Sequence, residues 1–240
     1  MRRDLILPGL FTLIGVIVLV GLGAWQWSRM GEKEALVATI RARSVLAPEP
    51  FPAASTWATM PLADMAYRPV SLSGHFDHGH ESHIFFSLAK PVNGVGGPGY
   101  LIVAPFVLDS GGTVLVNRGF VPQARKEKAR RAEGQTSGPL TITGLVRLPE
   151  MRGMFSGTDD PGRNVYFIRD PAALAKAQGL SGIAPVMVDQ KTPMPPGGLP
   201  MPAQTQVEIP NNHFSYALTW WSLAASLAVI FLLFARQPRS

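Results

Sequence analysis

Two long apolar stretches bracket the chain, at Leu5 to Trp27 and at Phe214 to Ala235. Neither contains Lys, Arg, Asp or Glu, and each exceeds the ~20 residues that an α-helix needs to cross the hydrocarbon core of a bilayer. The pattern therefore predicts two transmembrane helices, at residues 5–27 and 213–235. Residues 28–212 between them are numerous enough for one domain with a core of its own.

The segment between the apolar stretches alternates short β-type runs with turn residues. Runs rich in β-branched and aromatic residues are bounded by Gly, Asn, Asp or Pro, which is typical of strands. A turn at residues 109–112 joins two of these runs as a hairpin. The expected strands are 67–73, 82–88, 100–108, 113–118, 140–147, 164–168 and 185–188.

Two short helices are expected among the strands, at residues 123–132 and 171–178. The second has Pro171 just inside its start and Gly179 after its end, an asymmetry common in helices. Short strands with two helices predict a β-rich α+β domain, either a small barrel or a sandwich. Periodicity alone does not choose between the two.

The connections to the apolar stretches have different compositions. Residues 32–41 are mostly good helix formers without Gly or Pro, so the first helix should continue past the membrane and end before Pro48. Residues 192–210 contain six prolines and two glycines. That composition predicts a semi-extended tether from the domain to the second helix.

Basic residues set the expected orientation in the membrane. Arg236 and Arg239 follow the second apolar stretch, whereas residues 192–212 contain no Lys or Arg. The first stretch favours the opposite orientation, but long loops translocate largely regardless of charge. We therefore expect residues 1–4 and 236–240 in the cytoplasm and the domain outside. The first stretch is longer than the ~7–15 apolar residues of a signal peptide, which favours an uncleaved anchor. No Arg- and Ser-rich transit sequence precedes it, which favours a bacterial inner membrane over a mitochondrial one.

Charge and cysteine content exclude several classes of function and of binding site. The formal net charge is +6, and the four arginines and one aspartate of the tails supply half of it. The domain is thus only weakly basic, which argues against nucleic-acid binding. The chain has no cysteine, which excludes disulfides, thiolate zinc sites and covalent c-type haem attachment. Any metal or haem must be held by His, Met, carboxylate or Tyr.

Four histidines lie within nine residues, at His75, His78, His80 and His83. Imidazoles this close can bind copper or zinc. The alternative is a polar hairpin tip, because Gly79 divides the cluster and strand alternation would send the two inner histidines to one face and the two outer ones to the other. We take the hairpin tip as the working interpretation and keep a copper site as the alternative.

Two further basic features have more than one interpretation. The run at residues 125–131 either grips lipid headgroups or an acidic partner, or is the solvated face of a helix in which Glu127 and Arg131 pair at i,i+4. We prefer the solvated face. Arg118 ends an expected strand before Gly119, so it can reach a ligand carboxylate or close a local salt bridge, and these two interpretations stay open.

Aromatic and polar residues gather at the outer ends of the two apolar stretches. On the first, Trp25 and Gln26 lie four and three residues before Arg29, so ring, amide and cation can share a helix face. The second carries a stripe at helical spacing: His213, Tyr216, Ala217 and Trp220. We expect the two stripes to face each other across one pocket, apolar below, with a nitrogen ligand and an arginine at its rim.

Haem has the polarity that such a pocket suits. Its macrocycle is apolar, its iron accepts a neutral imidazole, and its propionates bind cations and water. From the residues alone a second interpretation stays open, in which His213 only caps the second helix or binds a headgroup.

The string from Gly23 to Arg29, with Lys33, resembles the Trp-Gln-x-x-Arg-x-x-x-Lys signature of the Surfeit locus protein 1 family of cytochrome c oxidase assembly factors. Further segments resemble family segments in the same order. They are residues 67–70, 74–77, 115–122, 144–150, 210–213 and 216–220. The resemblance spans nearly the whole chain, and the ordered set is more specific than any single segment.

The resemblance implies two transmembrane helices around an external domain, and a role in binding haem a and assisting its insertion into the core subunit of the oxidase. It associates the histidine of the Asn-His motif, His213, with haem iron as axial ligand. The other expected roles are a polar group beside the ligand at Gln26, pocket walls at Trp25, Tyr216 and Trp220, and a cation for the propionates at Arg29 or Arg118.

The expected function is therefore that of a non-enzymatic assembly factor, and the chain offers no nucleophile–base pairing or phosphate loop. The expected cofactor is haem a, and the expected partners are core subunit I of cytochrome c oxidase and membrane lipids, with haem a synthase as a further candidate. Two alternatives remain. They are a haem-free scaffold for an oxidase assembly intermediate, and a periplasmic copper carrier that uses the cluster from His75 to His83.

Overall fold

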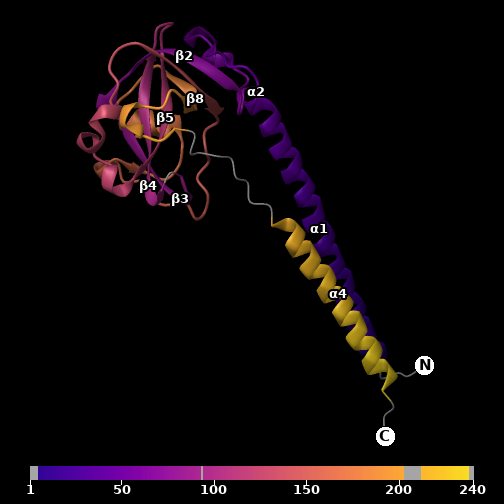
Figure 1. The fold of residues 1–240 in the computed structure, drawn as a ribbon. Helices are drawn as coiled ribbons and strands as arrows, with labels where there is room; N and C mark the ends of the chain where they lie inside the picture. Colours follow the sequence, from indigo (N-terminus) through magenta and orange to yellow (C-terminus); the bar gives the residue numbers. More distant parts are fainter. Residues whose placement is uncertain (1–4, 93, 203–211, 238–240) are drawn as a thin grey trace. The chain divides into compact units, whose positions relative to one another are not determined.

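The computed structural model describes residues 5–92, 94–202 and 212–237. The chain divides into two compact units, one formed by Met1–Arg41 with Glu208–Ser240 and the other by Ala42–Val207. The first unit contains α4 (His213–Arg236) and all of α1 (Ile6–Ser44) up to Arg41, and the second is a β-rich domain (Figure 1). The expected arrangement of two terminal apolar helices around a β-rich domain is confirmed.

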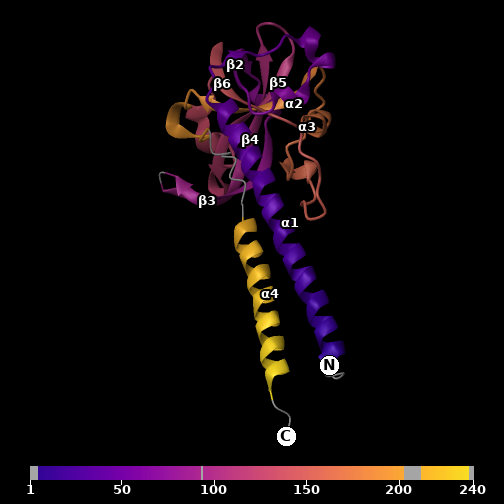
Figure 2. The same cartoon turned by 90° about the vertical axis from the view of Figure 1, so that its right-hand side faces the viewer.

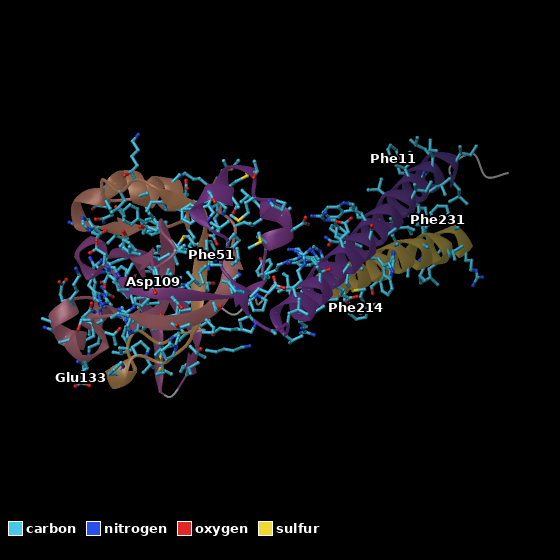
Figure 3. All side chains as sticks on the ribbon, turned by 90° about the horizontal axis from the view of Figure 1, so that it is seen from above. Phe11, Phe51, Asp109, Glu133, Phe214 and Phe231 are labelled. Atoms are coloured by element: carbon cyan, nitrogen blue, oxygen red, sulfur yellow. The ribbon has the colours of Figure 1, made fainter. Side chains whose placement is uncertain are left out.

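Within the described residues, α1 and α4 are long and apolar enough to cross a membrane. Helix α1 has 39 residues and, as expected, continues past the apolar stretch and ends before Pro48. Large apolar side chains project from both helices, and Phe11 is 66 % exposed (Figure 3). Such a surface suits hydrocarbon better than water.

Small residues bring α1 and α4 close together. A Cβ atom on Gly23 would lie 2.2 Å from Nε1 of Trp221, and one on Gly15 would lie 2.9 Å from Cδ2 of Leu227. On α4, Ala217 is fully buried. The later residue on α1, Gly23, contacts the earlier residue on α4, Trp221. The two helices are therefore antiparallel (Figure 2). Close backbone approach at small residues is a common basis of helix packing in membranes.

The domain is a closed barrel with three additional strands. The sheet order is β1-β2-β6-β8-β5-β4-β3-β7, and β2 also pairs with β4. That pairing closes β2, β6, β8, β5 and β4 into a ring, which decides between the barrel and the sandwich. The strands are β1 (Glu49–Pro50), β2 (Pro69–Phe76), β3 (Ser82–Val92), β4 (Val95–Leu108), β5 (Thr113–Pro122), β6 (Leu140–Arg147), β7 (Val165–Tyr166) and β8 (Ile183–Thr192).

Two apolar cores lie on opposite faces of the sheet. Alternate residues of the ring strands form the first core, which includes Leu72, Phe106, Val116 and Val186. The opposite faces of β4, β5 and β8 form the second core with β3 and α3 (Pro171–Ala177). Strand β5 is therefore buried on both faces, which explains its nearly continuous apolar sequence. The predicted hairpin at residues 109–112 joins β4 to β5, and α3 matches the helix predicted at 171–178.

Two local predictions were wrong. Residues 123–132 do not form one solvated helix, but two 3₁₀ helices, η4 (Gln123–Arg125) and η5 (Lys128–Gly134), with a kink at Arg131. The kink carries the Arg131 side chain inward to Glu81 instead of outward to Glu127. The histidine cluster does not cap a hairpin either, because β2 and β3 pair with β4 and not with each other.

The proline-rich segment after β8 packs on the domain over its described part. Met201 is buried and exchanges two backbone hydrogen bonds with Phe120 of β5, at 2.8 and 2.9 Å. The expected extended tether is thus replaced by a packed segment as far as residue 202. The rest of the expected tether, residues 203–210, lies outside the described residues.

Candidate functional site

A hydrogen bond joins the two helices of the first unit at His213, the first residue of α4. Its Nδ1 lies 2.6 Å from Oε1 of Gln26 on α1. An amide oxygen only accepts, so Nδ1–H donates and, in the neutral ring, the lone pair is on Nε2. Within the described part of the chain Nε2 has no hydrogen-bond partner. The ring binds α1 and does not cap the N–H groups of its own helix, and its free nitrogen can coordinate a metal.

The seam between the helices is filled by aromatic rings and small residues. The ring centroid of Trp27 lies 5.9 Å from that of Trp221 and 6.3 Å from that of Phe214. Beside them, Gly23 leaves no room for even a methyl group against Trp221. At these contacts the seam has no room for a macrocycle, so the pocket predicted between two facing stripes does not lie at this part of the seam.

The predicted wall residues lie on the outside of the helix pair. Trp25 is 56 % exposed and Tyr216 is 55 % exposed, whereas Trp220 is half-buried. Successive helix residues are rotated by about 100°, so Trp25 points away from the face on which the next residue, Gln26, meets α4. Trp25 and Tyr216 can contact lipid or a ligand at the surface, but they do not face each other.

Arg29 is exposed and pairs with Glu32 on its own helix, with 2.5 Å between Nη1 and Oε2. The helical rotation places Arg29 on the opposite flank of α1 from Trp27, and Tyr216 on the opposite flank of α4 from Phe214. In an antiparallel pair these two flanks lie on the same side. A cation and a phenol ring therefore accompany His213 on one surface of the pair, away from the packed aromatic rings.

Arg118 does not fit the predicted role of a rim cation. It lies on β5 inside the domain, is only 1 % exposed, and donates from Nη2 to the carbonyl oxygen of Gly134 at 2.6 Å. Burial lowers the pKa of its guanidinium to about 10. An enclosed guanidinium cannot reach a surface ligand. Among the described residues Arg118 forms no salt bridge either, because its hydrogen-bond partner is a carbonyl and not a carboxylate.

The clustered histidines are bound to separate partners. Nδ1 of His80 lies 2.6 Å from Oδ2 of Asp77, and Nε2 of His78 lies 2.9 Å from the carbonyl oxygen of Thr136. His83 is buried against Glu81, and His75 is exposed on β2. Among the described residues, no three His, Asp or Glu side chains are arranged to hold a metal ion.

The comparisons with known proteins agree with the arrangement of the chain. The SURF1 family profile matches residues 13–225, a range that includes every candidate residue named above. The chain belongs to the SURF1 family. It is 36 % identical to Surfeit locus protein 1 of Mus musculus over 230 residues, which cover 92 % of this chain and 73 % of that protein. The human protein of the same name is 35 % identical over 88 % of this chain and 71 % of its own length. A SURF1-like protein of Drosophila melanogaster is 36 % identical over 92 % of this chain and 75 % of its own length.

Two structural contacts of this SURF1-family chain were not predicted from its sequence. Gly23 and Ala217 close the seam, and a glycine inside an apolar helix is the sequence signal that could have indicated this. The buried pair of Glu81 and Arg131 was also missed, because the partners are 50 residues apart and Arg131 sits in a run of charges typical of a surface.

The Glu81–Arg131 pair ties the residue just before β3 to η5 inside the domain. Both side chains are fully enclosed, and Glu81 also accepts a hydrogen bond from Nε2 of His83 at 3.0 Å. Burial by itself raises the pKa of the Glu81 carboxyl, but the bonds from His83 and Arg131 outweigh it and hold the pKa below its ordinary value. Glu81 is therefore ionised at neutral pH and binds Arg131 of η5 and His83 of β3 together.

Proposed function

We propose that this SURF1-family chain binds haem a on the outer surface of its helix pair and assists the insertion of haem into core subunit I of cytochrome c oxidase, without catalysing a reaction. The observation that carries the proposal is the hydrogen bond between Gln26 and His213, which fixes the imidazole and leaves Nε2 available. Metal-bound histidines generally donate their other N–H in this way, which orients the ring and raises its basicity.

The residues around His213 fit haem in chemical type. When bound, haem a would supply an iron that accepts an imidazole nitrogen and propionates that pair with cations. Nε2 of His213 would hold the iron, and the exposed rings of Trp25 and Tyr216 with the half-buried ring of Trp220 offer apolar contact. Arg29 is the cation for a propionate, and its exposed partner Glu32 is easily displaced because surface ion pairs contribute only about 0–1 kcal/mol.

The proposed setting is a bacterial inner membrane. Two apolar helices support a membrane location, and Arg236 and Arg239 after the second helix support cytoplasmic termini and a periplasmic domain. Haem a synthase is the expected donor, since haem a that has just been formed must be passed to a protein that binds it.

The proposal is tested by purifying the full chain in mild detergent from two matched strains, one that makes haem a and one that does not. The absorption spectrum of haem a should accompany the chain only from the first strain. A chain that restores oxidase assembly but never carries haem would support the haem-free scaffold instead. A chain that binds stoichiometric copper but no haem would support the copper carrier.

A further inference from the structure

Unpartnered polar atoms gather inside the domain around Arg118, independently of the helix pair. The guanidinium carbon of Arg118 lies 4.5 Å from the centroid of the Phe76 ring at the end of β2. Its Nη2 bonds to Gly134, whereas the buried Nε and Nη1 atoms have no hydrogen-bond partner. A buried donor that is left unsatisfied costs about 1–3 kcal/mol, and more when it is charged, so two such donors on one cation need an acceptor.

His78 and Gln135 bring further unpartnered atoms to the same place. The ring of His78 lies 5.7 Å from that of Phe76, and its buried Nδ1 has no partner. Gln135 stands between Gly134, which Arg118 binds, and Thr136, which His78 binds. Both polar atoms of the Gln135 side chain are buried and unpartnered. Three side chains, from β5, from η3 (His78–His80) and from the segment after η5, thus have buried polar atoms without a partner, and the backbone next to Gln135 contacts both of the others.

The charges around Arg118 favour an anion. Among the described residues no carboxylate pairs with Arg118, because Glu81 is bound by Arg131 and His83. Burial lowers the pKa of Arg118, and the positive charge of Arg131 lowers it further. The negative charge of Glu81 raises the pKa again, but only in part. Lys128 adds a further cation through its bond to the carbonyl oxygen of His78. The enclosed region therefore has more positive than negative charge.

We propose that Arg118 and Gln135 form a buried binding site for one small monovalent anion, such as chloride or formate, beside the ring of His78. The anion would accept hydrogen bonds from Nε and Nη1 of Arg118 and from the amide of Gln135, and it would balance the charge of the guanidinium. Because the anion binds only the folded domain, it stabilises that domain. This role is separate from haem binding.

The test measures the thermal unfolding midpoint of the full chain in detergent as chloride or bromide replaces gluconate at constant ionic strength. Gluconate is too large for an enclosed site. The site predicts a saturable rise of the midpoint with the small anion, as mass action requires of a ligand that binds only the folded state. The rise should disappear in Arg118→Gln and persist in Arg163→Gln, whose arginine side chain is 84 % exposed.

A crystal of the wild-type chain grown with bromide gives an independent result that does not depend on how variants fold. An anomalous peak within hydrogen-bond distance of Arg118 supports the site. A weakened midpoint response in Gln135→Leu supports it as well. Equal midpoints in chloride and gluconate, an undiminished response in Arg118→Gln, or only an ordered water at Arg118 in the bromide crystal would overturn the proposal.

Discussion

Gln26 and His213 are 187 residues apart in the sequence and are joined by a hydrogen bond of 2.6 Å. The bond fixes the orientation and the tautomer of the imidazole, so that Nε2 keeps its lone pair. It also links the segment that carries the Trp-Gln signature to the segment that carries the histidine. The two parts of the family resemblance thus meet as one structural element.

Replacing Gln26 with Leu should weaken haem binding without removing the ligand. The imidazole loses the acceptor that orients it, and loss of such a partner typically lowers metal affinity about 10–100-fold. Titration of haem a into the purified chain measures the change. Ser28→Ala, at an exposed position on the same helix, should bind like the wild type. Unchanged affinity in Gln26→Leu would show that the hydrogen bond does not support the ligand.

Replacing Gly23 with Leu should separate α1 from α4, because even a Cβ atom there would lie 2.2 Å from Nε1 of Trp221. Gly21→Leu is the matched control, since nothing lies within 4 Å of its Cβ position. Contact between the two helices can be measured by disulfide cross-linking of Gly15→Cys with Leu227→Cys, because the chain has no other cysteine. After oxidation and cleavage within the domain, the fragments should stay joined in the control and separate in Gly23→Leu. Equal cross-linking in both would contradict the packing.

Replacing Glu81 with Gln should destabilise the domain by about 3–5 kcal/mol, because Arg131 is left as an unpaired buried charge. The pKa of Glu81 is held below its ordinary value of 4.5, so its contribution is present above about pH 4.5 and is lost as the pH falls through the lower folded-state pKa. The variant should therefore show a weaker loss of stability on acidification. Denaturant unfolding between pH 3 and pH 7 measures this effect. Exposed Glu127→Gln is the control, and an equal loss in that variant would argue against the buried pair.

Replacing Gly119 with Ala should release the segment that ends at Met201. Gly119 has a φ angle of +124°, and a Cβ atom there would lie 1.9 Å from the carbonyl oxygen of Met201. Gly182→Ala is the control, because Gly182 also has a positive φ angle but nothing lies within 4 Å of its Cβ position. That variant should lose only about 1–2 kcal/mol of stability, the cost of a left-handed conformation for a residue with a side chain. Limited proteolysis after residue 192 should be faster in Gly119→Ala alone. Equal rates in the two variants would mean that the close approach is unimportant.

The sequence predicted the elements of this chain better than their contacts. Strand β6 (Leu140–Arg147) was placed correctly because its alternation is set by residues next to each other in the chain. Closure of the barrel depends on β2 meeting β4 at Phe76 and Phe106, which no local pattern encodes. The kink at Arg131 was missed for the same reason, because a distant carboxylate decides it.

The candidate site was predicted in composition but not in arrangement. Spacing placed Gln26 and His213 near the outer ends of the two apolar stretches, and the structure joins them. The orientation of Trp25 depends on which face of α1 meets α4, and the position of Gly23 decides that face. Arg118 was ambiguous because its environment is built by residues 134–136, far along the chain.

The most direct test of the haem assignment is the haem content of His213→Ala, purified as the full chain from cells that make haem a. His75→Ala is the matched control, since His75 is an exposed histidine on β2. The account predicts that the wild type and His75→Ala carry haem a, and that His213→Ala reaches the membrane in normal amount without it. Wild-type haem content in His213→Ala would contradict the assignment of His213 as the ligand.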